Sequence, residues 1–282
     1  LRICGVEVKL KTSVKKIEKS EVFKVFTDSE IFEAKKLIIA TGGKSYEVTG
    51  SSGDGYSFSK ELGLKIVEPR PALTPCYIKD YSYTTLAGVS FRNAILELWR
   101  DNKKLGTYEG DLLFTHKNLS GPLIIDNSRY IKKDDKLRIN FSGENLEIFE
   151  KNLRNTINNN GNKFVKNIFD NPNFSERFIK VILKECEISE ETKCNSLKKE
   201  QIKRLIEALG NHAYEVSKLE GFNIAMVTAG GVALEEINKN TMESKKIKDL
   251  YIVGELLDID GDTGGYNIQG AYSTGALAAE SI

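Results

Sequence analysis

The sequence predicts an α/β protein in which a doubly wound domain is interrupted by an inserted domain. Two short apolar runs, 37–40 and 250–253, have the composition of buried parallel strands. The first leads into Thr41-Gly42-Gly43 and the second into Gly254. The stretch between these runs has the texture first of strands and then of helices. We therefore expect a first part at 1–75, an inserted domain at 76–220 that is β-rich and barrel-like to 142 and helical after it, and a last part at 221–282.

The first part is expected to alternate short strands with one helix. Val6, Val8 and Leu10 alternate with charged or polar residues, which predicts a half-buried strand. The elements expected after it are strands at 22–26, 31–32 and 37–40 and a helix at 54–62 that Gly63 ends. Three prolines within seven residues, Pro69, Pro71 and Pro75, indicate a boundary or a rigid crossover.

The inserted domain changes texture near residue 143. Strands are expected at 95–99, 105–108, 112–114 and 137–141, separated by turns. Helical spacing of apolar residues follows at 146–157 and 202–209. Its basic and acidic residues are nearly equal in number, which is typical of solvated helix faces.

The last part repeats the pattern of a strand followed by glycine. A buried strand at 224–227 is expected to end in 228–231, and one at 250–253 to end in Gly254 and Glu255. The stretch 267–282 is rich in small residues and predicts a helix packed closely against its neighbours.

Composition excludes several classes of protein. With 41 basic and 40 acidic residues the net charge is +1, which argues against a polyanionic partner such as nucleic acid. No apolar run approaches the roughly 20 residues that span a bilayer, so no membrane partner is expected. Four cysteines without a C-x-x-C pair indicate reduced thiols in a cytoplasmic protein. A small-molecule substrate is expected, and the oligomeric state stays open.

Other chemistries find little support. His116 and Ser120 lack the strained turn of a catalytic serine, so a structural hydrogen bond is the favoured role for the histidine. Cys186 and Cys194 are spaced unsuitably for a redox pair. The aspartates in 258–262 are followed by no complete cation-binding loop, and two histidines leave little room for a metal site. No metal is expected, and no catalytic residue is assigned.

The glycine-rich strand ends are the candidate ligand site. In doubly wound folds a strand that ends in glycine delivers a ligand to backbone amides, and the Glu255 carboxylate could accept hydrogen bonds from sugar hydroxyls. The run 264–267 leads into the last helix, whose free N–H groups and positive end favour negative charge.

A series of ordered motifs strengthens this interpretation. They are ATGGKSY at 40–46, TGSSGDGY at 49–56, RPAL at 70–73, LFTH at 113–116, LSGP at 119–122, VTAGGV at 227–232, TMESK at 241–245, GELLDIDG at 254–261, GGYNIQ at 264–269 and TG at 274–275. Together they resemble the BaiN-like, or aminoacetone-oxidase-type, family of FAD-dependent oxidoreductases, which have a glutathione-reductase-type FAD domain. The resemblance covers nearly the whole chain.

The resemblance implies FAD as cofactor and hydride transfer between FAD and a small molecule, with NAD(P)H as reductant. It places Val14 at the adenine, 41–42 on the pyrophosphate side, Gly254 and Glu255 beneath the ribityl and phosphate, and 264–269 at the flavin ring. The residues it marks for the cofactor are Val14, Ala40, Thr41, Gly42, Gly43, Gly254, Glu255, Gly264, Gly265, Tyr266, Asn267, Ile268 and Gln269. Looser candidates are 49–53, Arg70 and 228–231.

One feature of the resembled family is missing from the sequence. No G-x-G-x-x-G follows a strand, and Gly53-Asp54-Gly55 does not complete that motif. We expect that the N-terminal dinucleotide-binding unit is absent and that this chain alone binds FAD weakly or not at all. The alternative is a truncated, cofactor-free scaffold or partner-binding fragment without activity of its own.

Overall fold

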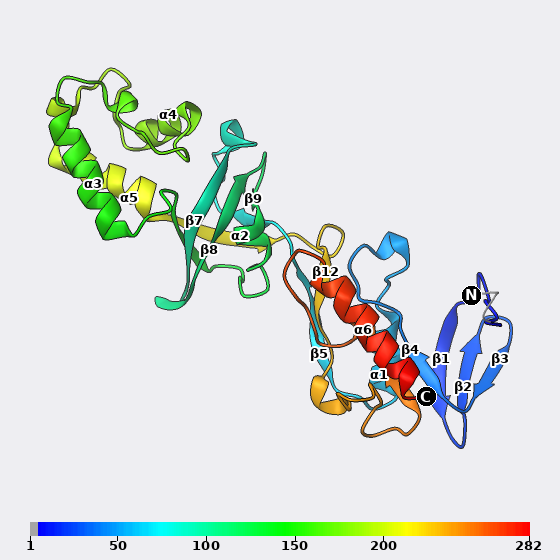
Figure 1. The fold of residues 1–282 in the computed structure, drawn as a ribbon. Helices are drawn as coiled ribbons and strands as arrows, with labels where there is room; N and C mark the ends of the chain where they lie inside the picture. Colours follow the sequence, from blue (N-terminus) through cyan, green and yellow to red (C-terminus); the bar gives the residue numbers. More distant parts are fainter. Residues whose placement is uncertain (1–4) are drawn as a thin grey trace. The chain divides into compact units, whose positions relative to one another are not determined.

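The computed structural model describes residues 5–282 and divides them into two compact units (Figure 1). Among these residues, unit 1 consists of 5–72 and 222–282, and unit 2 of Leu73–Gly221. No helix among the described residues has both the length and the apolar character that crossing a membrane requires.

Unit 1 contains three small sheets. Their strands are β1 (Val14–Lys19), β2 (Phe23–Thr27) and β3 (Ile31–Ala34) in an antiparallel sheet, β4 (Leu37–Ile39) parallel to β13 (Leu250–Ile252), and β5 (Ile66–Ala72) antiparallel to β12 (Val227–Val232). The parallel pair joins strands that lie more than two hundred residues apart in the sequence, with Ile39 opposite Ile252. The two apolar runs predicted to be parallel strands are therefore neighbours in one sheet. Burial on both faces is wrong for β4, because Ile38 is 41% exposed.

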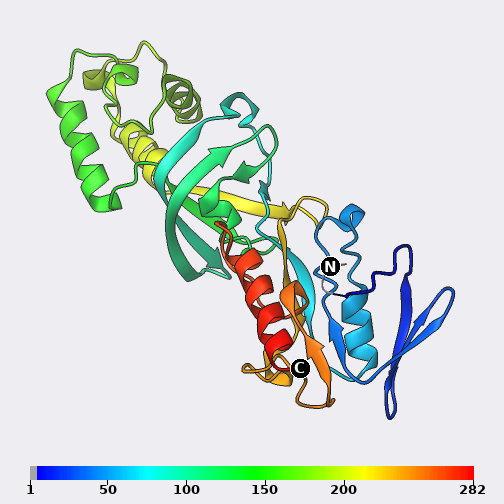
Figure 2. The same cartoon turned by 45° about the vertical axis from the view of Figure 1, so that its right-hand side comes forward.

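Two helices accompany these sheets. Helix α1 (Asp54–Glu61) buries Tyr56 and Phe58 and is followed by Gly63, which has a φ of 86° that favours glycine. Helix α6 (Tyr266–Glu280) runs along unit 1 in both views, drawn in red (Figures 1 and 2). Both helices were expected, but α6 is not packed closely on all sides, because Ala278 is its only buried residue.

Two sequence-based expectations for unit 1 are wrong. Val6, Val8 and Leu10 are exposed and form no strand, because no neighbouring strand pairs with them among the described residues. The strand expected at 224–227 instead begins at Val227 and continues through Gly231. It continues because Gly230 and Gly231, with φ of 89° and 136°, take up an irregularity in the pairing of β12 with β5.

Unit 2 is built around a closed barrel of six strands. They are β6 (Cys76–Ile78), β7 (Ser90–Arg100), β8 (Lys103–Phe114), β9 (Leu119–Ser120), β10 (Lys136–Asn140) and β11 (His212–Leu219), in the order β10-β11-β6-β9-β8-β7. The expected strands at 105–108 and 112–114 are one continuous strand, β8. Strand β11 lies in the range expected to be helical, where Tyr214 and Val216 alternate toward the core.

The helices of unit 2 share the core of the barrel. They are α2 (Pro122–Ile125), α3 (Leu146–Asn159), α4 (Glu176–Glu185) and α5 (Lys199–Gly210). Phe178 of α4 packs its ring 4.7 Å from that of Phe91 and 5.0 Å from that of Phe141, measured between centroids. Strands and helices of the insertion therefore form one hydrophobic core.

Half-buried His212 makes the stability of unit 2 depend on pH. Its Nε2 lies 3.1 Å from the Tyr83 hydroxyl and its Nδ1 lies 3.2 Å from the Ala208 carbonyl oxygen. Burial lowers the pKa of His212 from 6.5, so at pH values between its folded pKa and 6.5 the unfolded chain binds more protons than the folded chain. The contribution of His212 is fully present above pH 6.5 and is lost as pH falls toward the folded pKa.

We therefore expect the free energy of unfolding of unit 2 to be lower at about pH 5.5 than at about pH 7.5. Fluorescence of Trp99, the only tryptophan in the chain, reports denaturant unfolding of this unit. Burial also raises the pKa of Glu185, which has the opposite effect on stability, so the His212→Gln variant is the control that isolates the histidine. An equal pH dependence in the variant would contradict the assignment.

Candidate functional site

The parallel pair β4 and β13 brings two glycine-containing loops to one edge of its sheet. The N–H of Val253 donates to the carbonyl of Ile39 at 3.2 Å, so both strands end at the same level. Ala40–Gly43 follows β4 and Gly254–Glu255 follows β13. Such an edge is where α/β sheets hold ligands.

Gly43 is the point of closest approach between these loops. A Cβ atom at this position would lie 2.6 Å from Thr228 Oγ1 and 2.8 Å from Glu255 Cδ. Gly43 is itself buried, whereas Ala40 and Thr41 are exposed. Glycine is needed at position 43 for packing within unit 1, and the exposed backbone before it is left for a ligand.

Thr228 holds the loops in place. Its Oγ1 accepts hydrogen bonds from the N–H groups of Lys44 at 2.8 Å and Ser45 at 3.1 Å. Its own N–H donates to Glu255 Oε1 at 2.7 Å. The fully buried threonine thus fixes both glycine loops relative to β12.

Glu255 is anchored on one side by this bond and on the other by Tyr56. The Tyr56 hydroxyl donates to the Glu255 carbonyl oxygen at 3.3 Å. Burial, and then the neighbouring Glu255 carboxylate, raise the pKa of Tyr56, so its hydroxyl stays protonated at neutral pH.

A small cavity of about 170 Å³ lies between the second glycine loop and α6. The N–H of Gly254 donates to Thr274 Oγ1 at 2.9 Å, which fixes this loop against the helix. The residues that line the cavity are Gly254, Glu255, Ile259, Asp260, Gly261, Tyr266, Asn267, Gly270, Ala271 and Thr274. Most of those on the helix are small, so backbone lies near the surface of the cavity.

The start of α6 is shaped by two glycines and an asparagine. Gly264 and Gly265 have φ of 108° and 95°, and an added Cβ at Gly265 would meet nothing within 4 Å. Asn267 closes the preceding loop, since its Oδ1 accepts from the Gly261 N–H at 2.8 Å and its Nδ2 donates to the Gly261 carbonyl at 2.9 Å. The first N–H groups of the helix and its positive end are therefore presented on an open surface.

The structure brings together most of the residues expected from the sequence. Those that line the cavity are Gly254, Glu255, Tyr266 and Asn267, and Gly264, Gly265, Ile268 and Gln269 lie in the same loop and first helical turn. Ala40, Thr41, Gly42 and Gly43 lie at the edge of the same sheet. Val14 is separate, as the first residue of β1 paired with Thr27, and it does not line the cavity.

Arg70, a looser candidate, does not line the cavity, and neither do His116 and Cys186, which were considered for other chemistries. Arg70 is exposed on β5 opposite Ala229, and no ion pair of its side chain is found among residues 5–282. His116 is exposed, and Cys186 is buried in unit 2, where burial raises the pKa of its thiol to about 11. Neither residue has the surroundings of a catalytic group.

Six residues of the cavity were not among the expected cofactor residues: Ile259, Asp260, Gly261, Gly270, Ala271 and Thr274. The last three belong to α6. Their spacing of one, three and four residues places them on one face of a helix, which is the signal that could have identified them. Sequence reasoning also missed that Thr228 is the hydrogen-bonding centre of the site.

Comparison with known proteins identifies relatives over the whole chain. The HI0933-like protein Rossmann domain family matches residues 1–281. A protein of Haemophilus influenzae named ribosomal RNA dihydrouridine synthase is 28% identical over 99% of this chain and 69% of its own length. A protein of Escherichia coli with the same name is 30% identical over 99% of this chain and 68% of its own length. The 3-dehydro-bile acid delta(4,6)-reductase of Clostridium scindens is 30% identical over 92% of this chain and 64% of its own length.

The chain therefore spans about two thirds of the length of these relatives. The HI0933-like family is FAD-binding, and the residues at the cavity fit part of such a cofactor. Glycine backbone without side chains borders the open space, and a helix N-terminus offers unpaired donors. The volume suits a segment of FAD and not the whole molecule.

Proposed function

The chain belongs to the HI0933-like family, a family of flavin oxidoreductases, and from this premise we propose that it forms part of an FAD-dependent reductase of carbon–carbon double bonds. The observation that carries the proposal is the cavity at the edge of the parallel sheet, bordered by Gly254 and the start of α6. FAD, when bound, supplies the hydride-transfer chemistry, and NAD(P)H is the reductant we propose for it.

The residues at the cavity would bind and orient the cofactor. Gly254, Gly264 and Gly265 allow close approach to backbone N–H groups, because they carry no side chain. The positive end of α6 favours a negatively charged part of the cofactor beside 264–269. Thr228 and Tyr56 hold the loops that form this surface and do not themselves reach it.

The names of the relatives point to one class of reaction. Dihydrouridine is uridine with two hydrogens added, and a delta(4,6)-reductase acts on double bonds at two positions of a 3-oxo compound. In both cases hydrogens are added across a carbon–carbon double bond conjugated to a carbonyl group. We propose this reaction class for the protein that carries this chain.

Two substrates of this class are candidates. A uracil base of ribosomal RNA is favoured, because two relatives with that name align over 99% of the chain. A small unsaturated ketone is the second candidate, favoured by the bile acid reductase. The sequence-based expectation of a small-molecule substrate and no nucleic-acid partner corresponds to the second candidate. It stays a prediction, as does the cytoplasmic location.

Net charge does not decide between the two. Charge governs nonspecific, salt-sensitive binding to phosphates, whereas a single unpaired base is recognised by stacking and hydrogen bonds. A protein with net charge +1 is therefore a poor general binder of nucleic acid but can still recognise one base.

Activity can be tested on the protein as its gene encodes it. The flavin-loaded protein is incubated without oxygen with NADH or NADPH and with either a ribosomal RNA fragment or a 3-oxo-4,6-diene steroid. The favoured proposal expects a gain in RNA mass equal to two hydrogens per modified uridine. A saturated steroid with unchanged RNA would support the second candidate. Flavin that is reduced by neither nicotinamide would contradict the proposed reductant.

Substitutions at two glycines of α6 can distinguish an effect on cofactor binding from an effect on folding. Neither Gly270 nor Gly275 would bring an added Cβ within 4 Å of another atom, but only Gly270 lines the cavity. Alanine at either position should raise the free energy of unfolding by about 0.5–1 kcal/mol, because glycine is a poor helix former. We expect Gly270→Ala to weaken flavin binding measured by fluorescence quenching, and Gly275→Ala to leave it unchanged. Equal flavin affinity in both variants would remove the cavity from the cofactor site.

A further inference from the structure

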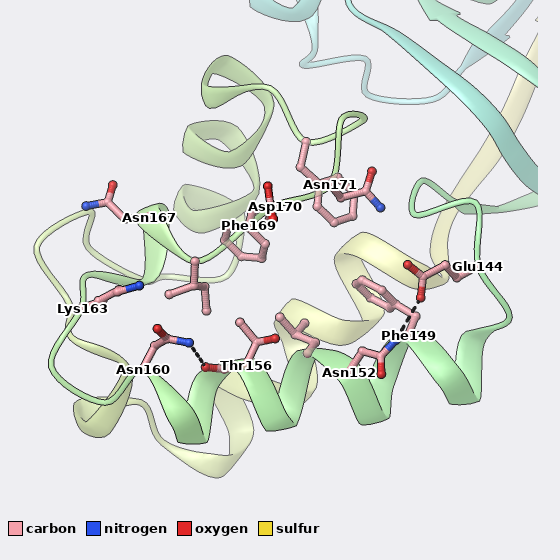
Figure 3. Close-up of a pocket in the computed structure, with 13 residues that line it drawn as sticks. Glu144, Phe149, Asn152, Thr156, Asn160, Lys163, Asn167, Phe169, Asp170 and Asn171 are labelled. Carbon is pink, nitrogen blue, oxygen red and sulfur yellow. Dashed lines mark hydrogen bonds between the residues drawn. The ribbon is translucent and has the colours of Figure 1, made fainter.

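Unit 2 contains a second cavity, of about 590 Å³, far larger than a water site and within the range of ligand pockets. It lies between α3 and the loop at 163–174 (Figure 3). Figure 3 shows Asn152, Thr156 and Asn160 along the face of α3 that is turned toward the loop carrying Phe169. Side chains from both walls thus converge on one space.

The cavity combines aromatic rings with amide groups. Phe149 and Phe174 are 5% and 8% exposed, with ring centroids 6.0 Å apart, and Phe169 packs its ring 5.9 Å from that of Phe174. The amides of Asn152, Asn160, Asn167 and Asn171 surround these rings. An asparagine side chain offers two donors and one acceptor, which is the combination that the edge of a base requires.

Several of these polar groups are not used within the protein. Asn160 Nδ2 donates to the Thr156 carbonyl at 2.8 Å, and Asn171 Nδ2 donates to the Ser142 carbonyl at 3.0 Å. In contrast, the side chains of Lys163, Asn167 and Asp170 make no hydrogen bond or ion pair with any residue in the described part of the chain. Both donors and acceptors are therefore left for a ligand.

The chemistry of the cavity excludes several classes of ligand. A hydrocarbon such as a steroid would leave the amides unpaired, which is unfavourable when they are desolvated. A simple anion would meet the carboxylates of Glu144 and Asp170 as well as Lys163. A flat, neutral group with donors and acceptors on its edge can both contact the aromatic rings and form hydrogen bonds with the amides.

We propose that this cavity binds an unpaired base of the RNA substrate. The base would contact the half-buried ring of Phe169 and exchange hydrogen bonds with Asn167 and Thr156. Single-stranded RNA is recognised in this manner, by stacking on aromatic rings and by hydrogen bonds to base edges. The inference rests on the proposed function for its choice of RNA, and it deepens that function by giving the insertion a role in selecting the substrate.

Binding to a fluorescently labelled single-stranded RNA oligonucleotide, measured by anisotropy without flavin or reductant, tests the inference. Asn167→Ala removes a side chain without internal partners, and Thr156→Val removes only a hydroxyl, so both variants should fold. Each is expected to weaken binding about fivefold, the loss of one hydrogen bond. Asn158→Ala is the matched control, since Asn158 is exposed on α3 and does not line the cavity.

A competition experiment distinguishes the base from the phosphate. Uridine or adenosine monophosphate should displace the oligonucleotide, whereas ribose 5-phosphate should not. Affinity unchanged in both cavity variants, or equal displacement by ribose 5-phosphate, would overturn the inference. If the protein reduces RNA but both cavity variants bind RNA as tightly as the wild type, the cavity is not the binding site and the proposed reaction still holds. If the variants weaken RNA binding but the protein does not reduce RNA, the cavity assignment holds and the proposed reaction is wrong.

Discussion

Replacing Gly265 by valine is expected to weaken flavin binding by roughly a hundredfold, about 3 kcal/mol. The residue caps the start of α6 with a φ of 95°, and it directly precedes Tyr266, which lines the cavity together with Gly254, Gly261 and Gly270. A branched side chain at this position would fill open space that the cofactor needs, and it would disfavour the backbone conformation that presents the first N–H groups. Gly264→Val, at a φ of 108°, should act in the same direction.

Gly63 provides the matched control for this prediction. It has a φ of 86°, nothing within 4 Å of an added Cβ, and a position after α1 in the same unit. Gly63→Val should therefore introduce similar backbone strain without touching the cofactor surface. Flavin affinity measured by titration should fall only in the Gly264 and Gly265 variants. If all three variants lose flavin equally, the effect is one of folding and the assignment of this loop is wrong.

Replacing Thr228 by valine is expected to lower the free energy of unfolding of unit 1 by about 2–4 kcal/mol. Valine has nearly the same shape but accepts no hydrogen bond, so the N–H groups of Lys44 and Ser45 lose their acceptor. Leaving buried or half-buried donors without partners is more costly than the hydrogen bonds are worth when formed. The loop after β4 should then detach from β12.

Hydrogen exchange measured by mass spectrometry can locate this effect. Peptides covering β5, β12 and 41–46 should exchange faster in Thr228→Val, and peptides covering the barrel strands β7 and β8 should not change. Thr49→Val is the control, because the exposed Thr49 hydroxyl bonds only to the nearby Tyr46 carbonyl, at 2.8 Å. Exchange that rises equally in both variants would contradict the central role of Thr228.

The sequence was informative where local pattern and final contacts agree. The runs 37–40 and 250–253 were correctly predicted as parallel strands, but burial on both faces was correct only for β13, since Ile38 of β4 is 41% exposed. The helices at 54–62 and 267–282 carry their own start or stop signals, and the family assigned from the ordered motifs is confirmed. The cofactor site was predicted through that family and through glycine placement, and its residue assignments stay predictions.

Pattern alone failed where tertiary pairing decides the structure. Val6, Val8 and Leu10 alternate like a strand but find no pairing partner among the described residues. Gly230 and Gly231 suggested the end of a strand, although glycine can also continue a strand through an irregular pairing. Strand β11 follows α5 almost directly in the sequence. Only its pairing with β10 and β6 shows that it is a strand of the barrel. Thr228 was only a looser candidate, because the N–H groups of Lys44 and Ser45 that it accepts from lie 184 and 183 residues away in the sequence.

The most direct test of the account is the visible absorption spectrum of the protein, purified as its gene encodes it, incubated with FAD and then desalted. We expect the bands of oxidised flavin to remain with the protein, to bleach on addition of NAD(P)H, and to be absent from the Gly265→Val variant but present in Gly63→Val. A folded protein that stays colourless after incubation with FAD, or that holds flavin equally in both variants, would contradict the assignment of the cavity beside α6 as the cofactor site.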